Sequence, residues 1–200
     1  MSARHFLMAA ALATFAPVAV SAQTPASDVP LSLDVPPAFH VTVGFAHASW
    51  SDGALSGANG VGLTVSRHVF GPVRGVFDFA TLSGNTLSGS GTEAARHYLV
   101  GAGIAVAPEL TVGGHGVRPK VGAAIGTWVS DPASDSSSTR SQNAWELFVG
   151  FDANLYGPLT LGVRYRHVPM RLQDVAAQGP SVPHTALSAH IFQVGLGVRF

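Results

Sequence analysis

Histidine is the most frequent residue type in this 200-residue chain that could bind a metal, since there are nine histidines and no cysteine. The absence of cysteine excludes disulfides, thiolate metal sites and cysteine nucleophiles. The histidines form no tight spacing such as His-x-His or His-Glu-x-x-His. His40, His68 and His97 fall on the same, charge-bearing face of their alternating runs but belong to different segments. We therefore predict no metal site and no cofactor.

Charged side chains are the second group that could do chemistry, and they are scarce. They make up 11% of the chain, under half of the roughly 25% usual in soluble domains. The formal net charge is zero, which argues against nucleic acid as a partner. Seven of them alternate with apolar residues inside short runs: Asp78, Arg118, Lys120, Glu146, Asp152, Arg164 and Arg166. This pattern places them on one common face of a set of strands.

Eight alternating runs can be counted, and period-two alternation predicts β-strands. They span roughly 39–49, 60–70, 73–82, 96–106, 117–129, 144–155, 159–168 and 187–200. Their connections alternate in length. Short ones lie at Gly71-Pro72, Pro108 to Gly116 and Gly157-Pro158, and long polar ones lie at 50–59, 83–95, 130–143 and 169–186. An even strand number with alternating short and long connections is typical of an outer-membrane barrel.

The two faces of these runs differ in polarity. One face is apolar, as with Phe39, Val41, Val43 and Phe45, and the other holds glycine, polar and charged residues with little apolar bulk. A soluble barrel would need the apolar face inside, whereas a barrel in lipid needs it outside. Eight strands leave an interior that side chains can fill. The seven charged residues are therefore predicted to form a lumenal ion-pair network of structural character, with the three acids paired to the four bases.

Aromatic residues fall near the predicted strand ends, where a membrane protein carries interfacial girdles. We expect an outer girdle of Trp50, Trp128, Trp145 and Tyr98, with Trp128 alternatively plugging the outer mouth, and a periplasmic set of Phe70, Tyr156 and Phe200.

The N-terminal segment has the features of a signal peptide. Arg4 and His5 precede an apolar run from Phe6 to Val20, and Ala-Val-Ser-Ala at 19–22 supplies the small residues that signal peptidase reads. The predicted organisation is thus a signal peptide at 1–22, a proline-rich periplasmic segment at 23–37 and a barrel at 38–200. A retained membrane anchor is the alternative for the first segment, but the run is shorter than the about 20 apolar residues that a spanning helix needs.

The last strand resembles the assembly signal of bacterial outer-membrane proteins, with alternating apolar residues and a terminal aromatic: Phe192, Val194, Leu196, Val198 and Phe200. With the eight runs and the signal peptide, the chain resembles the small outer-membrane β-barrel family akin to the OmpA transmembrane domain. The resemblance implies an all-β, eight-stranded antiparallel up-and-down transmembrane barrel in the outer membrane. It also implies contact with outer-membrane lipid and insertion by the outer-membrane assembly machinery through the C-terminal strand. We expect a monomer.

The resemblance implies no single activity, and several roles stay open. The expected role is structural or surface-interacting, without enzymatic activity. The alternatives are a narrow diffusion channel, a lipid A-modifying enzyme and a secreted soluble barrel that holds a ligand. The lipid A deacylases carry a motif similar to His-x-Ser-Asn. Here His167 matches, but Pro169 occupies the place of the nucleophile and no Glu follows Glu146.

Overall fold

The computed structural model describes residues 38–51, 55–88, 91–133, 140–171 and 186–200. All regular elements in these ranges are strands: β1 (Phe39–Trp50), β2 (Ala58–Phe70), β3 (Val73–Ser88), β4 (Gly91–Val106), β5 (Leu110–Val112), β6 (His115–Pro132), β7 (Arg140–Tyr156), β8 (Leu159–Arg171) and β9 (Ala186–Arg199). The described ranges contain no helix that is long and apolar enough to cross a membrane. The predicted signal peptide at 1–22 and proline-rich segment at 23–37 lie outside the described residues.

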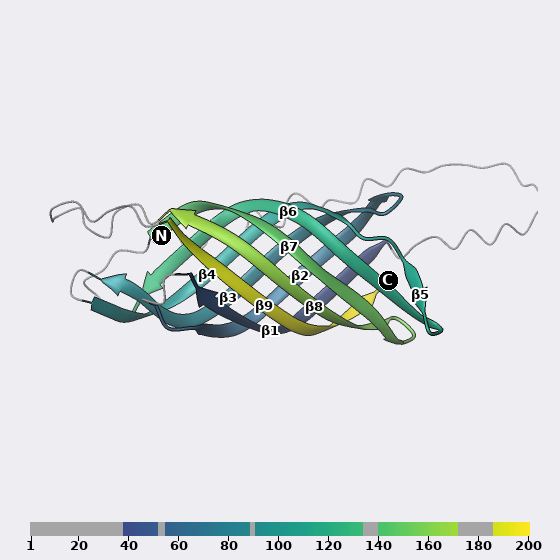
Figure 1. Ribbon diagram of the computed structural model, residues 1–200, viewed down its shortest axis with the longest axis horizontal. Coiled ribbons are helices and arrows are strands. Elements are labelled where there is room, and N and C mark those ends of the chain that lie inside the picture. Colours follow the sequence, from purple (N-terminus) through teal and green to yellow (C-terminus); the bar gives the residue numbers. More distant parts are fainter. Residues whose placement is uncertain (1–37, 52–54, 89–90, 134–139, 172–185) are drawn as a thin grey trace, which may run out of the picture. The chain divides into compact units, whose positions relative to one another are not determined.

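Eight of these strands form one closed ring. They follow the order β4-β3-β2-β1-β9-β8-β7-β6, and antiparallel pairing of β4 with β6 closes the sheet (Figure 1). Every neighbouring pair in the ring is antiparallel, and all but one pair are joined along the chain. The predicted eight-stranded up-and-down barrel is therefore confirmed.

The first and last strands meet at the end of the barrel that carries the short turns. Phe39 and Phe200 exchange two backbone hydrogen bonds of 2.8 and 3.1 Å, and their rings stack at 6.0 Å. Gly44 and Gly195 are paired farther along β1 and β9, where the backbones approach so closely that a Cβ on Gly44 would lie 2.1 Å from the carbonyl oxygen of Val194. Glycine at this position lets the two strands pair without a clash.

The short connection at Pro108 to Gly116 is more ordered than predicted. It holds the three-residue strand β5, which pairs with the start of β6 where β4 no longer does. Gly113 and Gly114 have φ angles of 58° and 81°, which suits a two-residue hairpin turn with positive φ at both positions. The segment is thus a small hairpin at the end of the barrel rather than a plain turn.

The long connections are shorter than predicted, because the strands extend into them. β3 and β4 remain paired as far as Ser88 and Gly91, so most of 83–95 is a hairpin and not a loop. β6 continues to Pro132 and β8 to Arg171. Beyond the apolar band both faces of a strand meet water, so apolar alternation ends there although the backbone pairing continues.

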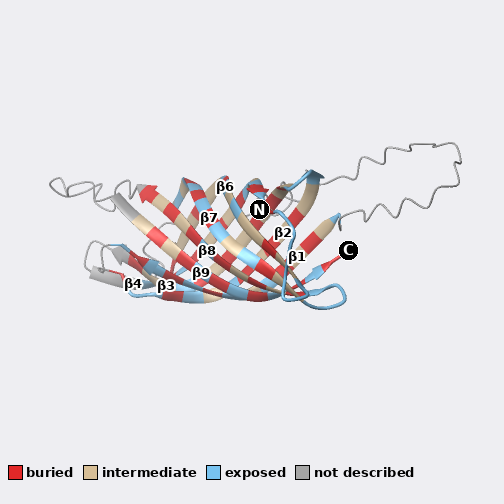
Figure 2. Ribbon diagram, turned by 45° about the vertical axis from the view of Figure 1, so that its right-hand side comes forward, coloured by how far each residue is buried: buried red, intermediate tan, exposed pale blue. Residues whose placement is uncertain are grey.

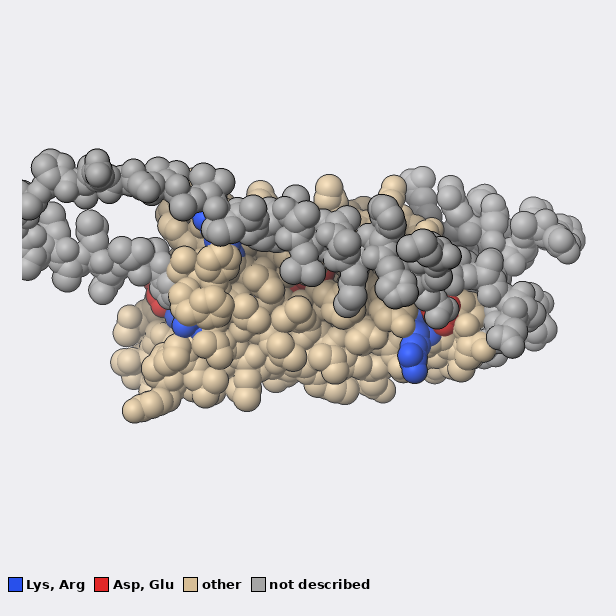
Figure 3. All heavy atoms as spheres, turned by 180° about the vertical axis from the view of Figure 1, so that it is seen from behind, with Lys and Arg blue, Asp and Glu red and all other residues tan. Residues whose placement is uncertain are grey.

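The two faces of the barrel are inverted relative to a soluble protein. Buried and exposed residues alternate along each strand (Figure 2). The exposed positions include large apolar side chains such as Ile125 at 75%, Ile104 at 65% and Phe45 at 58%, while the buried ones include Asp78 and Arg166, both at 0%. On the face seen in Figure 3, Lys and Arg are visible only toward the two ends of the barrel. This distribution fits an outer surface in contact with lipid.

Candidate functional site

The candidate site is the barrel interior, because that is where the structure places the charged residues. Of the seven residues predicted for the lumenal network, Asp78, Arg118, Glu146, Asp152, Arg164 and Arg166 are buried, and the Lys120 side chain is 12% exposed. They come from four strands, β3, β6, β7 and β8. The period-two alternation of each strand turns these side chains inward while the intervening apolar residues face out.

The central cluster contains two acids and two arginines. Asp78 Oδ1 accepts hydrogen bonds from Thr64 Oγ1 at 2.7 Å and from Arg164 Nη1, and it lies 3.5 Å from Arg166 Nη2. The carboxylate oxygens of Glu146 lie 3.9 Å from each arginine. The Arg164 guanidinium also packs over the Phe148 ring at 3.6 Å. Such close pairing is what fully desolvated charges require, since an unpaired charge there costs several kcal/mol.

A second cluster links Asp152 to a lysine and a histidine. Lys120 Nζ lies 2.7 Å from Asp152 Oδ1, and His40 Nδ1 lies 3.3 Å from Asp152 Oδ2. The other ring nitrogen of His40 is 2.8 Å from Thr160 Oγ1. An acid, a histidine and a hydroxyl in series resemble the order of a hydrolytic triad. Thr160 is 0% exposed, however, so its hydroxyl is out of reach of a lipid or any other large substrate.

The third cluster lies at the end that carries the short turns. Glu109, in the turn between β4 and β5, pairs through one oxygen with Arg118 and through the other with Arg199, both at 2.9 Å. The Glu109 side chain is 46% exposed, while the two arginine side chains are 3% and 7% exposed. Burial alone would raise the pKa of Glu109, but hydrogen bonds and charge from Arg118 and Arg199 hold that pKa below its usual value. The pairing predicted for Arg118 with the lumenal acids is wrong, because its ion pair is with Glu109.

The opposite end of the interior is apolar, which corrects the expectation of little apolar bulk inside. Buried residues there form one cluster: Ala46, Ala48, Trp50, Leu55, Ala58, Ala80, Leu82, Leu99, Trp128, Ala144, Val168, Met170, Ala189 and Ile191. Alanines from several strands make room for two indoles and several branched side chains in one layer. This layer is on the side of the long connections, beyond the charged clusters.

Two tryptophans and a histidine form the centre of this apolar layer. Trp50 and Trp128 meet edge-on at 5.5 Å, and His97 lies 5.4 Å from Trp50 and 5.5 Å from Trp128. The indole nitrogens donate to the backbone oxygen of Ser56 and the hydroxyl of Ser130, both at 3.1 Å. The assignment of Trp50 to the outer girdle is wrong, because its even position on β1 turns it inward. Trp128 takes its alternative place inside the mouth, and Trp145, at 49%, is exposed to lipid.

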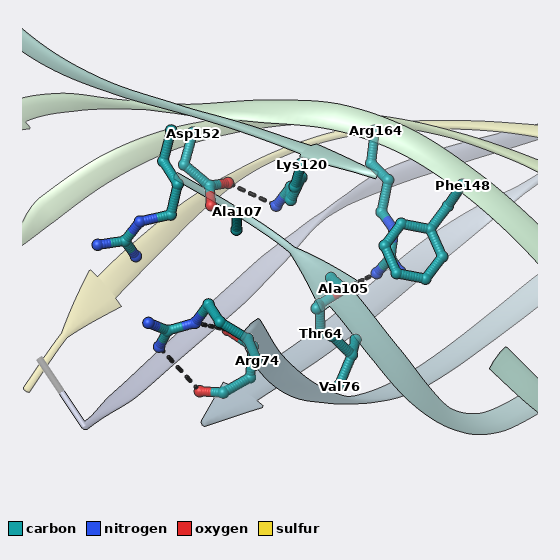
Figure 4. Close-up of a pocket in the computed structure, with 11 residues that line it drawn as sticks. Thr64, Arg74, Val76, Ala105, Ala107, Lys120, Phe148, Asp152 and Arg164 are labelled. Carbon is teal, nitrogen blue, oxygen red and sulfur yellow. Dashed lines mark hydrogen bonds and ion pairs between the residues drawn. The ribbon is translucent and has the colours of Figure 1, made fainter. Parts of the chain in front are cut away.

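Two small cavities lie among the interior side chains. One cavity of about 10 Å³ lies among the charged residues. Its lining is drawn in Figure 4, where Lys120 reaches Asp152 and Arg164 reaches Thr64. A second cavity, beside Thr42 and Gln193, is of the same size. Each is about the size needed for one water molecule. The described residues contain no group of three His, Asp or Glu side chains that could hold a metal ion.

Comparison with known proteins agrees with this architecture. The family described as outer membrane protein beta-barrel domain matches residues 8–200. The chain belongs to this family. A comparison with curated proteins gives no match.

Among solved structures, the barrel is similar to Neisserial surface protein A, with a TM-score of 0.60 and 17% identity, covering 82% of this chain and 97% of that one. It is also similar to OprG of Pseudomonas aeruginosa, with a TM-score of 0.52 and 18% identity over 82% and 96% of the two chains. The Ail attachment invasion locus protein of Yersinia pestis, solved with a heparin analogue, gives 0.50 and 14% over 81% and 97%. At these identities the likeness shows the fold alone, and the family match is what makes this chain an outer-membrane β-barrel protein.

The predicted ion-pair network omitted several interior residues of this outer-membrane barrel. His40, Arg74 and Arg199 have the inward parity and are buried, and Glu109 reaches the interior from a turn. Alternation in the sequence already places His40 and Arg199 on the inward face, and it could also have found Arg74. Glu109 could not be found that way, because the turn that carries it has no strand periodicity.

Residues of the C-terminal strand are placed as the pattern requires for a lipid-facing strand. Phe192, Val194, Leu196, Val198 and Phe200 are between 37% and 65% exposed. Their role as an assembly signal remains a prediction.

Proposed function

We propose that this outer-membrane barrel is a closed structural protein that presents its outer end at the cell surface, and that it catalyses no reaction. The proposal rests on one observation: both an apolar layer and ion-paired clusters fill the interior of the barrel. The Trp50–Trp128–His97 layer packs one end, and the ion-paired clusters around Asp78 and Asp152 fill the interior between this layer and the short-turn end. A continuous path for solutes would need to pass both layers, and the two cavities described above are each about 10 Å³.

Single-channel recording in a planar bilayer tests the closed interior. We expect no unit openings from the refolded barrel, with a general porin in the same bilayer as the positive control. Steady unit openings would refute the closed barrel and favour a narrow diffusion channel. The described interior would give such a channel a selectivity, since it holds six basic side chains (Arg74, Arg118, Lys120, Arg164, Arg166 and Arg199) against four acidic ones (Asp78, Glu109, Glu146 and Asp152). An open lumen of this charge would prefer anions.

The absence of enzymatic activity is supported by the burial of the one triad-like arrangement described above. Thr160 is enclosed at 0% exposure, and Pro169 stands where a deacylase would carry its serine. Mass spectrometry of lipid A from cells with and without expression tests this. We expect unchanged masses. A lost or added acyl chain that appears only with expression would show that the barrel modifies lipid.

Surface presentation is tested by cysteine labelling, since the chain has no cysteine of its own. Ser56, between β1 and β2, is exposed at the end with the long connections, and Thr111 of β5 is exposed at the end with the short turns. A membrane-impermeant maleimide added to intact cells should label the variant Ser56→Cys and leave Thr111→Cys unlabelled until the outer membrane is permeabilised. The reverse pattern would overturn the orientation.

A further inference from the structure

The apolar outer face of the barrel is interrupted by a polar sector on three adjacent strands. Tyr165 and His167 of β8, His190 of β9, and His47 and Ser49 of β1 all point outward and are half-buried or exposed. His167 pairs with His190 across one strand boundary, and His190 pairs with Ser49 across the next. Three histidines therefore lie in one patch on the surface that faces lipid.

The depth of this patch follows from strand geometry. His167 lies eight positions beyond Leu159, where β8 begins at the short-turn end. A rise of about 3.3 Å per residue and a tilt of about 40° give about 2.5 Å per residue along the barrel axis, so His167 stands about 20 Å from that end. An apolar band of about 25 Å covers such barrels. A band that starts at Leu159 therefore ends only about 5 Å beyond the patch, so amphipathic side chains there can extend their polar ends to the outer headgroups.

The contacts within the patch leave hydrogen-bond donors available. Tyr165 Oη lies 2.6 Å from His190 Nδ1, and the His167 and His190 rings are 5.0 Å apart. If the tyrosine hydroxyl donates, His190 keeps a proton on Nε2. If the imidazolium donates through Nδ1, the hydroxyl proton becomes available instead. Either state offers the headgroup region at least one donor.

The surroundings of the patch favour an anion. Trp145, Leu147 and Val149 face outward from β7, and Phe192 does so from β9. His47 is the ionisable neighbour on β1, where its Nδ1 lies 2.8 Å from Asn59 Oδ1. The described outward positions of β7, β8, β9, β1 and β2 hold no Asp or Glu. No carboxylate on these strands therefore competes with an incoming anion, and Arg166 and Glu146 point to the other side of the sheet.

We propose that Tyr165, His167 and His190 bind the phosphate of an anionic lipid in the outer leaflet. The His167 and His190 rings lie 5.0 Å apart, so when both are protonated they repel each other, and a phosphate between them offsets that repulsion. The tyrosine hydroxyl adds a neutral donor to the same group. A protonated imidazole attracts a phosphate more strongly than a neutral one, so binding is stronger in acid than in base. This inference depends on the barrel being in the outer membrane and not on whether its lumen conducts.

Native mass spectrometry of the refolded, detergent-solubilised full barrel tests the proposal. The probes are dimyristoyl phosphatidic acid, dimyristoyl phosphatidylcholine and inorganic phosphate, each at about pH 5.5 and about pH 8. The variants are Tyr165→Phe and the pair His167→Gln with His190→Gln. The matched control is His115→Gln, an exposed histidine at the opposite end of the barrel. Heat-dependent gel mobility checks that each variant is folded.

We expect the wild type and the His115 variant to hold phosphatidic acid about tenfold more tightly in mild acid than at the higher pH, which corresponds to about 1.4 kcal/mol. The double histidine variant should lose this pH dependence, and Tyr165→Phe should weaken binding at both pH values. Equal retention by the wild type and the double variant would overturn the proposal. So would equal retention of phosphatidylcholine, or displacement of the lipid by inorganic phosphate at equal concentration.

Discussion

Removing Asp78 tests whether the interior charges hold the barrel together. Its carboxylate meets Thr64, Arg164 and Arg166 in a site with no exposure. The substitution Asp78→Leu leaves two buried arginines with Glu146, whose oxygens are 3.9 Å from each of them. Breaking a buried pair from one side costs about 3–5 kcal/mol, and we expect that loss in the free energy of unfolding.

The assay is urea unfolding in detergent micelles, followed by tryptophan fluorescence, because Trp50 and Trp128 are buried in the folded barrel. Asp78→Asn keeps an oxygen that accepts from Thr64 and should lose less, about 1–3 kcal/mol. The double variant Asp78→Leu with Arg164→Met removes one charge of each sign. It should be more stable than Asp78→Leu alone, because Arg166 and Glu146 still balance each other.

Two outcomes would refute this reasoning. An unchanged urea midpoint for Asp78→Leu would mean that the carboxylate does not compensate the arginines. A double variant that is no more stable than Asp78→Leu would attribute the loss to packing rather than to charge. In either case the interior charges would not form the stabilising network that their distances indicate.

Three further predictions concern other parts of the barrel and use the same unfolding assay. Trp50→Ala should cost about 3–5 kcal/mol because it opens a cavity in the apolar layer, whereas Trp145→Ala, on the lipid face, should cost clearly less; equal losses would contradict the inward position of Trp50. The pKa of Glu109 is lower in the folded state than in the unfolded state. The Glu109 ion pairs should therefore contribute fully to the free energy of unfolding above the unfolded-state pKa, and this contribution should disappear as the pH falls through the folded-state pKa. Glu109→Gln should therefore cost about 1 kcal/mol at neutral pH and nothing in strong acid, and a loss that persists in acid would count against the ion pair. Gly44→Ala should cost about 1–3 kcal/mol because the new Cβ meets a backbone carbonyl of β9. Gly75→Ala is the control, because a Cβ on Gly75 would have its nearest atom 3.8 Å away. If both substitutions lowered the free energy of unfolding equally, the clash at Gly44 would not be the cause.

Much of the architecture could be predicted from local pattern. Alternation in each run assigned Asp78, Glu146, Asp152 and Arg164 to one face, and the structure turns that face inward. The turns at Gly71 and Gly157 were also predictable, and both glycines have positive φ, at 49° and 54°. These features depend only on residues close in sequence, so a single run of the chain carries the information.

Features that depend on which strands meet could not be predicted in this way. Trp50 has inward parity, but an aromatic residue near a strand end equally suits an interfacial girdle. Only the meeting of β1, β4 and β6 residues around one axis decided that it packs against His97 and Trp128. Glu109 is the clearest case, because its two arginines are 9 and 90 positions away along the chain.

The sequence by itself determined that this chain forms a closed antiparallel sheet with lipid outside and charge inside. The period-two alternation, the turn residues and the low charge content can all be read from short stretches of the sequence. Acids and bases on the same face of the strands can be buried only if they pair with each other inside the barrel. The tertiary structure alone decided the partners: Arg164 and Arg166 share Asp78 and Glu146, Arg118 and Arg199 share Glu109, and the far end is filled by indoles. The physical reason is that pairing depends on strand register and tilt around the ring, which bring side chains within 3 to 4 Å regardless of their separation along the chain.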